Sequence, residues 1–265
     1  MNQKNLDYLK NGLQYSGFGD RLHQELERNV QQQLPAFQLK TELPFYQAAV
    51  SYTLHFRKSD QTDTYFFNKY DATLKTDKTD QEKSQTFYIN QNAGITAREA
   101  FNLLSGRAVH KELTNATGQP YKAWVQLEPD SQGEGGKTLL RQFHENYGYE
   151  LDKTLRPYAI REFHDPQQKE QLLRSLQRGN VQQVTVLLDG QEVKRFIEAS
   201  PQYKTINAYD EKLRPVKRET LLRPESQQAP SAKQRQQEQQ KGEKQAQSPE
   251  GEPVPKQTRR KGMAL

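Results

Sequence analysis

The sequence predicts an α+β protein in which N-terminal helices pack on an antiparallel four-stranded meander, followed by two tandem αβββ units and a disordered C-terminal tail. Three observations predict this arrangement. Leucines recur at helical spacing near the start of the chain, apolar residues then alternate with polar ones, and one segment is repeated later in the sequence. We expect the four regions to span residues 1–93, 94–150, 151–215 and 216–265.

Two short amphipathic helices are predicted before residue 35. Their apolar stripes consist of Leu6, Leu9 and Leu13 in the first helix, and of Leu22, Leu26 and Val30 in the second. Pro35 prevents the second helix from continuing, because the residue before a proline is pushed out of the helical region. Since apolar stripes are buried in folded proteins, both helices are expected to pack against the next part of the chain.

Four strands are predicted after Pro35, where the apolar period changes to two. The predicted runs are Phe37–Thr41, Val50–Arg57, Thr64–Thr76 and Gln85–Asn90, joined by polar turns. In the third run, the residues expected on one common face are Phe66, Tyr70, Ala72 and Leu74. An antiparallel meander commonly buries one face and leaves the other in water. We therefore expect the N-terminal helices to cover one face of this sheet.

An internal repeat predicts the tandem units. Gly118–Pro129 reads GQPYKAWVQLEP, and 72 positions later Gly190–Pro201 reads GQEVKRFIEASP. Each copy follows a predicted helix that ends at a glycine, Gly106 in the first unit and Gly179 in the second. Both copies are therefore expected to be equivalent strands, each placed behind a helix.

The C-terminal tail accounts for most of the net charge of +6. Residues 223–265 contain nine Lys and Arg against five Asp and Glu, whereas the preceding residues contain 30 against 28. The tail is rich in Gln, Lys, Glu and Pro and has hardly any apolar residues, so it is expected to be disordered. The nearly neutral remainder argues against a strongly basic folded domain.

The motifs of common enzymes and metal sites are missing from the sequence. Without cysteine, the chain has no disulfide, no thiolate nucleophile and no zinc site that needs sulfur. It contains no phosphate-binding loop, no HExxH and no GxSxG, and its five histidines lack ligand spacing. We therefore predict a non-enzymatic protein without cofactor or metal. The absence of a long apolar run predicts a cytoplasmic protein without membrane contact.

One face of the predicted sheet is a candidate nucleic-acid interface. If the apolar residues of the second run face the core, basic and aromatic side chains from three strands share the other face, namely His55, Arg57, Tyr65, Phe67, Lys69 and Tyr88. Aromatic rings among cations on an open sheet are typical of surfaces that bind single-stranded nucleic acid. The tail adds Arg259, Arg260 and Lys261. The alternative is that this face is covered, which would make Tyr65 and Phe67 ordinary core residues.

Several blocks of the sequence resemble a family of uncharacterised Bacteroidetes proteins that are frequently carried on conjugative transposons. The blocks are VSYTLHFRKSDQTDTYFFNKYDATLK, TFYIN, GITAREAFNLLSGRAV, QFHENYGYEL and SPQYKTIN, and the resemblance covers Leu6 to Arg214. It implies a prokaryotic cytoplasmic setting and a link to mobile DNA. The tandem region also resembles modules attached to DNA-processing proteins of these elements. The resemblance supplies no catalytic or binding residues.

Three functional hypotheses follow, and one of them, an enzyme whose site is dispersed along the chain, has no motif in its favour. In the first, the chain is a non-enzymatic accessory protein of a mobile element that binds single-stranded nucleic acid through the sheet face and the basic tail. In the alternative, it is a protein-interaction scaffold in which the αβββ units bind a partner, such as a DNA-processing protein of the same element, and the tail is a linker. Salt separates the two, because phosphate contacts weaken steeply with salt and apolar protein interfaces do not.

Overall fold

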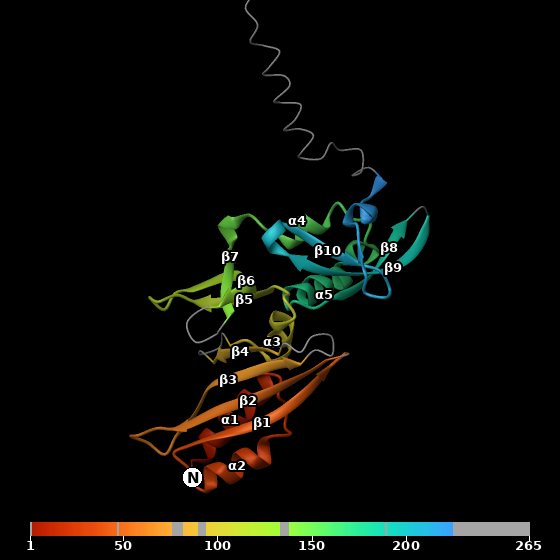
Figure 1. Cartoon of the computed structure of the whole chain (residues 1–265). Helices are drawn as coiled ribbons and strands as arrows, with labels where there is room; N and C mark the ends of the chain where they lie inside the picture. The colour runs from red at the N-terminus through yellow and green to blue at the C-terminus, as the bar shows by residue number, and fades with distance from the viewer. Residues whose placement is uncertain are drawn as a thin grey trace, which may run out of the picture. The chain divides into compact units, whose positions relative to one another are not determined.

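The computed structural model describes residues 2–46, 48–75, 82–89, 94–132, 138–188 and 190–224. All helices and strands given below belong to the unit Met1–Arg223 (Figure 1). Residues 225–265 lie outside the described residues, so the predicted disorder of the tail and the predicted roles of Arg259, Arg260 and Lys261 stay predictions.

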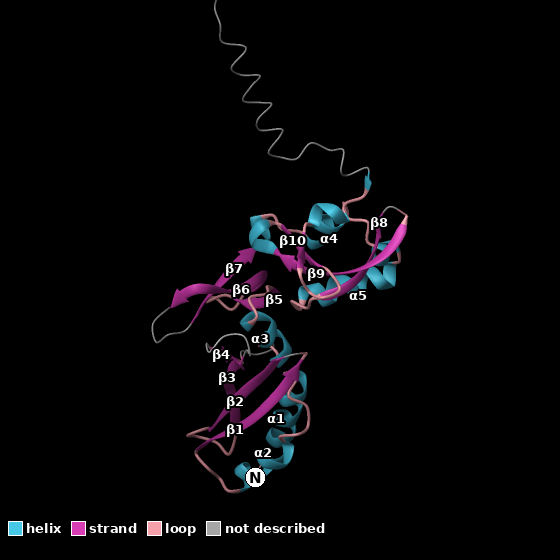
Figure 2. Cartoon of the chain, turned by 45° about the vertical axis from the view of Figure 1, so that its right-hand side comes forward, coloured by secondary structure: helices cyan, strands magenta, loops and turns pink. Residues whose placement is uncertain are grey.

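The N-terminal part of the chain is an antiparallel sheet with two helices on one face, as predicted (Figure 2). The helices are α1 (Gln3–Tyr15) and α2 (His23–Gln31). The strands follow in the order β1-β2-β3-β4, with bounds Ala36–Phe45, Ala48–Lys58, Tyr65–Lys75 and Lys83–Tyr88. The predicted leucine stripes of both helices are buried in one apolar core with the inner face of this sheet.

Aromatic side chains dominate this core. The ring of Phe18 lies edge-on against Tyr52 and Tyr70, with ring centroids 5.3 Å apart in both pairs. The two hydroxyls are also satisfied, because Tyr52 donates to the carbonyl of Ala97 at 2.7 Å and Tyr70 to that of Ile95 at 2.5 Å. Burial raises the pKa of the Tyr52 phenol well above its ordinary value. These two bonds tie the start of the next helix to the sheet.

Two αβββ units follow. The first consists of α3 (Ala97–Leu104) and the strands β5, β6 and β7, with bounds Val109–Thr114, Pro120–Gln132 and Thr138–His144. After α4 (Leu151–Leu155), the second unit consists of α5 (Pro166–Gln177) and the strands β8, β9 and β10, with bounds Gln182–Leu188, Gln191–Ser200 and Thr205–Tyr209. The sheet orders are β5-β6-β7 and β11-β10-β9-β8, in which β11 is Pro215–Val216. The predicted repeat is confirmed, since the two copies form β6 and β9, which are paired on both sides.

The ordered unit continues beyond residue 215. The short strand β11 (Pro215–Val216) pairs with β10, and a single turn of 3-10 helix spans Arg218–Leu221. Leu221 is buried in a second apolar core, which is formed by α4, α5, β8, β9 and β10 together with Trp124 and Phe143. The carbonyl of Leu221 accepts a hydrogen bond of 2.9 Å from the amide of Ala159. The expected boundary at residues 215 and 216 therefore falls within this sheet.

The helix-ending turns of the two units contact each other. In the first unit, the side-chain amide of Gln126 donates to the carbonyl of Gly106 at 2.7 Å. The repeat places Glu198 at the equivalent position of the second unit, and a carboxylate cannot donate a hydrogen bond. Instead, Arg107 of the first unit donates through Nε to the carbonyl of Gly179 at 2.9 Å. The first unit thus supplies a donor to the second.

The same contact requires glycine at position 179. Its backbone has φ +77°, and an added Cβ would lie 2.7 Å from the carbonyl oxygen of Ala108. Asn102 spans the junction and donates to the carbonyl of Arg178 at 2.6 Å and to the side chain of Asn180 at 3.0 Å. Only a residue without a side chain allows the turns to approach this closely.

Candidate nucleic-acid interface

A β-bulge in β3 decides which side chains the sheet exposes. His55 of β2 pairs with Lys69, but the next residue, Phe56, pairs with Phe67, so Asn68 is the extra residue. Tyr70, Ala72 and Leu74 face the core as predicted. Before the bulge the alternation is reversed, and Phe66 faces outward with 48% of its surface exposed. The prediction that Phe66 shares the buried face is wrong.

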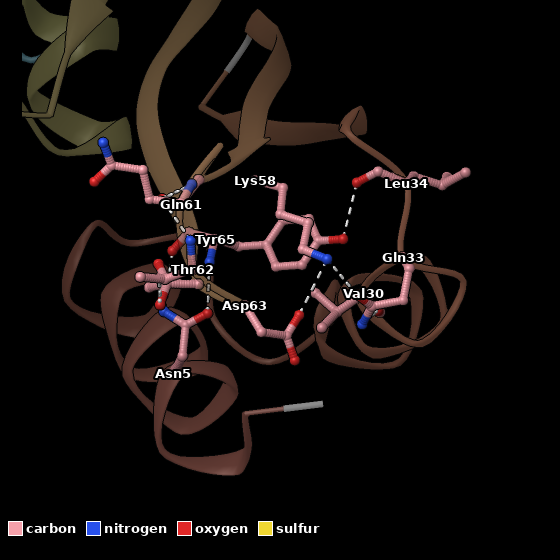
Figure 3. A network of polar contacts seen from close by, with 11 residues as sticks. Asn5, Val30, Gln33, Leu34, Lys58, Gln61, Thr62, Asp63 and Tyr65 are labelled. Carbon is pink, nitrogen blue, oxygen red and sulfur yellow. Dashed lines mark hydrogen bonds and ion pairs between the residues drawn. The ribbon is translucent and has the colours of Figure 1, made fainter.

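Tyr65 and Phe67 lie on the core side, which contradicts their expected exposure. Tyr65 is 1% exposed, and its hydroxyl donates to the carbonyl of Leu34 at 2.8 Å (Figure 3). Phe67 is half-buried and stacks on Phe56, with ring centroids 5.0 Å apart. The bulge shifts the register by one residue, which turns both rings to the core side of the sheet. They therefore cannot stack together on bases at the outer face.

The polar contacts around Tyr65 fix the end of the sheet to both helices. The Asn5 side chain of α1 accepts from the amide of Tyr65 at 2.8 Å and donates to its carbonyl at 3.0 Å. Lys58 at the end of β2 donates to the side chain of Gln33 and forms an ion pair of 3.2 Å with Asp63 (Figure 3). These contacts satisfy the backbone hydrogen-bonding groups at the start of β3. The role of the residues at this end of the sheet is therefore to stabilise the fold.

The remaining predicted residues do lie together on the outer face. Register places Gln38, His55, Lys69 and Tyr88 opposite one another on β1, β2, β3 and β4, so they form one row across the sheet. Paired side chains on adjacent strands share a face. In the next row, Arg57 pairs with Phe66. We call these two rows the basic-aromatic face.

The basic-aromatic face carries two exposed rings beside its cations. Tyr88 is 57% exposed, and Phe66 takes the outward position that the sequence assigned to Phe67. Arg57 is exposed and forms an ion pair of 2.9 Å with Asp60. Phe66 is thus a candidate stacking residue that the sequence alone did not identify.

A charged hydrogen-bond chain crosses the neighbouring row. His55 Nε2 lies 2.6 Å from Asp71 Oδ2, and Thr86 donates to Asp71 Oδ1 at 2.6 Å. The side chain of Gln38 lies 3.3 Å from His55 Nδ1. Burial favours the neutral form of Asp71, but the bonds from Thr86 and His55 outweigh it and hold the pKa of this carboxyl below its ordinary value. The chain therefore orients the imidazole at the centre of the face.

Replacing Thr86 by valine should raise the pKa of Asp71, because one hydrogen bond to the carboxylate is lost while the fold keeps a residue of similar shape. Carboxyl carbon shifts followed by NMR between pH 2 and 6 would measure the change. Since the folded pKa is depressed, the stabilising contribution of Asp71 is present above the unfolded value of about 4 and is lost as the pH falls through the folded value. An unchanged Asp71 titration in the valine variant would contradict this account.

A shallow groove lies at the bulge, within the basic-aromatic face. Its volume is about 340 Å³, and its lining includes Phe37, Gln38, His55, Arg57, Asn68 and Lys69. We call it the bulge groove. Its outward side chains include basic groups, amides and one imidazole.

The residues that the structure describes contain neither a candidate metal site nor a candidate membrane-spanning helix. No group of three or more histidines or acidic residues in these residues could hold a metal ion. Within the same ranges, no helix is both long enough and apolar enough to span a membrane.

The family "Erp protein C-terminus" matches residues 72–212, which is more than half of the 265-residue chain. The chain belongs to this family. The Erp protein C-terminus match covers both αβββ units and β4, but it begins after Lys69 and so leaves out most of the basic-aromatic face. It carries no information on a bacterial group or on mobile elements, so that part of the resemblance is untested. No match was found among curated proteins or among solved structures.

Proposed function

We propose that this protein binds single-stranded nucleic acid through the basic-aromatic face and does so as a non-enzymatic accessory protein. The observation that supports the proposal is the row of His55, Lys69 and Tyr88, with Arg57 and Phe66 beside it. The link to a mobile element rests on the sequence resemblance alone.

The chemistry of the face suits a flexible polyanion. Exposed aromatic rings stack on bases of any sequence, and lysine and arginine neutralise the phosphates. In the three rows at this end of the sheet, the cations Lys40, Arg57 and Lys69 face outward. Two carboxylates partly offset them, namely Asp71, which is hydrogen-bonded to Thr86, and Asp60, which is paired with Arg57. The face is therefore moderately basic although the folded part of the chain is nearly neutral.

The double change Phe66→Ala and Tyr88→Ala is expected to weaken binding of a single-stranded 12-mer. Base stacking contributes about 1–3 kcal/mol per base, so each lost platform should lower affinity roughly 5-fold to 150-fold. The salt dependence should stay nearly unchanged, because no phosphate contact is removed. Fluorescence anisotropy at several salt concentrations measures both quantities.

Tyr8→Ala is the matched control, because Tyr8 is an exposed tyrosine on α1, which packs on the opposite face of the sheet. It should bind as the wild type does. The proposal fails if the wild type does not bind single strands at low salt, or if the intact double variant binds as tightly as the wild type.

The second candidate function is a protein-interaction scaffold. It is favoured by two adjacent leucines on β7, Leu139 and Leu140, which lie at the edge of the β5-β6-β7 sheet and are exposed. Unpaired edges with apolar side chains are common sites of strand addition by a partner. Binding that is insensitive to salt would favour this function over the first.

A further inference from the structure

The bulge groove has the size and the lining of a site for one nucleotide, and this inference rests on the proposed nucleic-acid binding. Its volume is about 340 Å³, and its outward lining includes Ala36 and the imidazole of His55. Arg57 and Lys69 also line it. A base needs an apolar surface and its phosphate needs a cation, so the groove is complementary to a nucleotide of the bound strand.

Asn68 gives the groove a hydrogen-bonding group that the fold does not use. As the extra residue of the bulge, it is exposed, and its carbonyl accepts from the amide of Ile89 at 2.8 Å, which fixes its backbone. Among the described residues, its side-chain amide has no hydrogen-bond partner. Gln38, the other amide of the groove, already contacts the imidazole of His55. Asn68 is therefore the amide that remains for a ligand.

The side-chain amide of Asn68, with one donor group and one acceptor, matches adenine better than the other bases. An asparagine amide pairs with adenine in bidentate fashion, accepting from N6 and donating to N7. Guanine offers two acceptors at the corresponding edge and suits arginine instead. One N–H of the Arg57 guanidinium donates to Asp60 at 2.9 Å, whereas the described residues give the Asn68 amide no partner at all.

We propose that the bulge groove binds one adenine base of the single strand, that the amide of Asn68 pairs with its N6 and N7, and that Lys69 contacts its phosphate. The site thus adds a base preference to a surface that otherwise binds by stacking and charge.

The test compares three single-stranded DNA 12-mers in competition with a labelled strand, using the full chain. One probe is all cytosine, the second carries four central adenines, and the third carries four central guanines. The wild type should prefer the adenine probe over the other two by about 5-fold to 150-fold, the discrimination expected of one bidentate pair. Asn68→Ala should lose this preference while its affinity for the cytosine probe stays unchanged.

Thr73→Ala is the control, because Thr73 lies on the outer face but in the row that pairs with Ser51 and Ser84. It should keep the adenine preference. Equal binding of all three probes by the wild type would overturn the adenine site and leave the proposed function standing. A guanine preference, or an adenine preference that survives in Asn68→Ala, would also overturn it. If the wild type binds none of the probes, both proposals are wrong.

Discussion

Replacing Tyr65 by alanine should lower the free energy of unfolding by about 3–5 kcal/mol, the usual cost of removing a buried aromatic side chain. The ring is 1% exposed, packs against Phe37 with centroids 5.7 Å apart, and satisfies the carbonyl of Leu34. Removing it creates a cavity and leaves that carbonyl without its partner. Urea unfolding followed by circular dichroism measures the change.

Two variants make this prediction specific to the bulge. Tyr65→Phe keeps the ring and should cost only about 1 kcal/mol for the lost hydrogen bond. Phe66→Ala removes the adjacent ring, which the bulge directs outward, and should cost less than about 1 kcal/mol. If Phe66→Ala proved as destabilising as Tyr65→Ala, the assignment of the two rings to opposite faces would be wrong.

Replacing Arg107 by alanine should lower the free energy of unfolding by about 2–4 kcal/mol, because it holds contacts within the first αβββ unit and links that unit to the second. It donates to the carbonyl of Gly179 at 2.9 Å and to the side chain of Asn102 at 2.6 Å. Its guanidinium lies 4.9 Å from the ring centroid of Phe101. It also interacts electrostatically with Glu198, which is buried, while burial lowers the pKa of Arg107 below its ordinary value. Removing Arg107 leaves this carboxylate without a compensating charge.

The repeat suggests a compensating change. Glu198→Gln introduces the residue that the first unit has at Gln126, and it removes the buried charge. In the Arg107→Ala background it should recover part of the lost stability, so the effects of the two changes should not add. Arg98→Ala is the control, since Arg98 is exposed and donates to the side chain of Asn180 at 3.1 Å. A loss of less than about 1 kcal/mol in Arg107→Ala would contradict the coupling of the two units. Urea unfolding followed by the fluorescence of Trp124 reports on the second core directly.

The periodicity of apolar residues was sufficient to predict the N-terminal helices and the four strands, because these depend on short-range patterns. The repeat was predicted from the similarity of two segments. The periodicity failed at Tyr65, Phe66 and Phe67, where three aromatic residues in succession fit either face. The sequence contains no warning of this, since Phe66, Tyr70, Ala72 and Leu74 fit strict alternation. The odd spacing between the inward residues Phe67 and Tyr70 is visible only in the strand pairing. A bulge is the ordinary cause of such an odd spacing.

The candidate face was predicted in part. Four residues share the outer face as expected, namely His55, Arg57, Lys69 and Tyr88. Their orientation follows from the regular alternation of side chains in β2, in β4 and in the part of β3 after the bulge. Asn68 and the bulge groove could not be predicted, since they arise from pairing between strands. The contact of Arg107 with Gly179 has no local signal either, because the two residues are 72 positions apart in the sequence.

The most direct test of nucleic-acid binding by the basic-aromatic face is an NMR titration of the 15N-labelled full chain with a single-stranded 12-mer at low salt. We predict that the largest amide shift changes occur in the row of Gln38, His55, Lys69 and Tyr88 and at Phe66, and that α1 and α2 on the opposite face change little. Shift changes confined to β7 and the αβββ units, or no changes at low salt, would contradict the proposal.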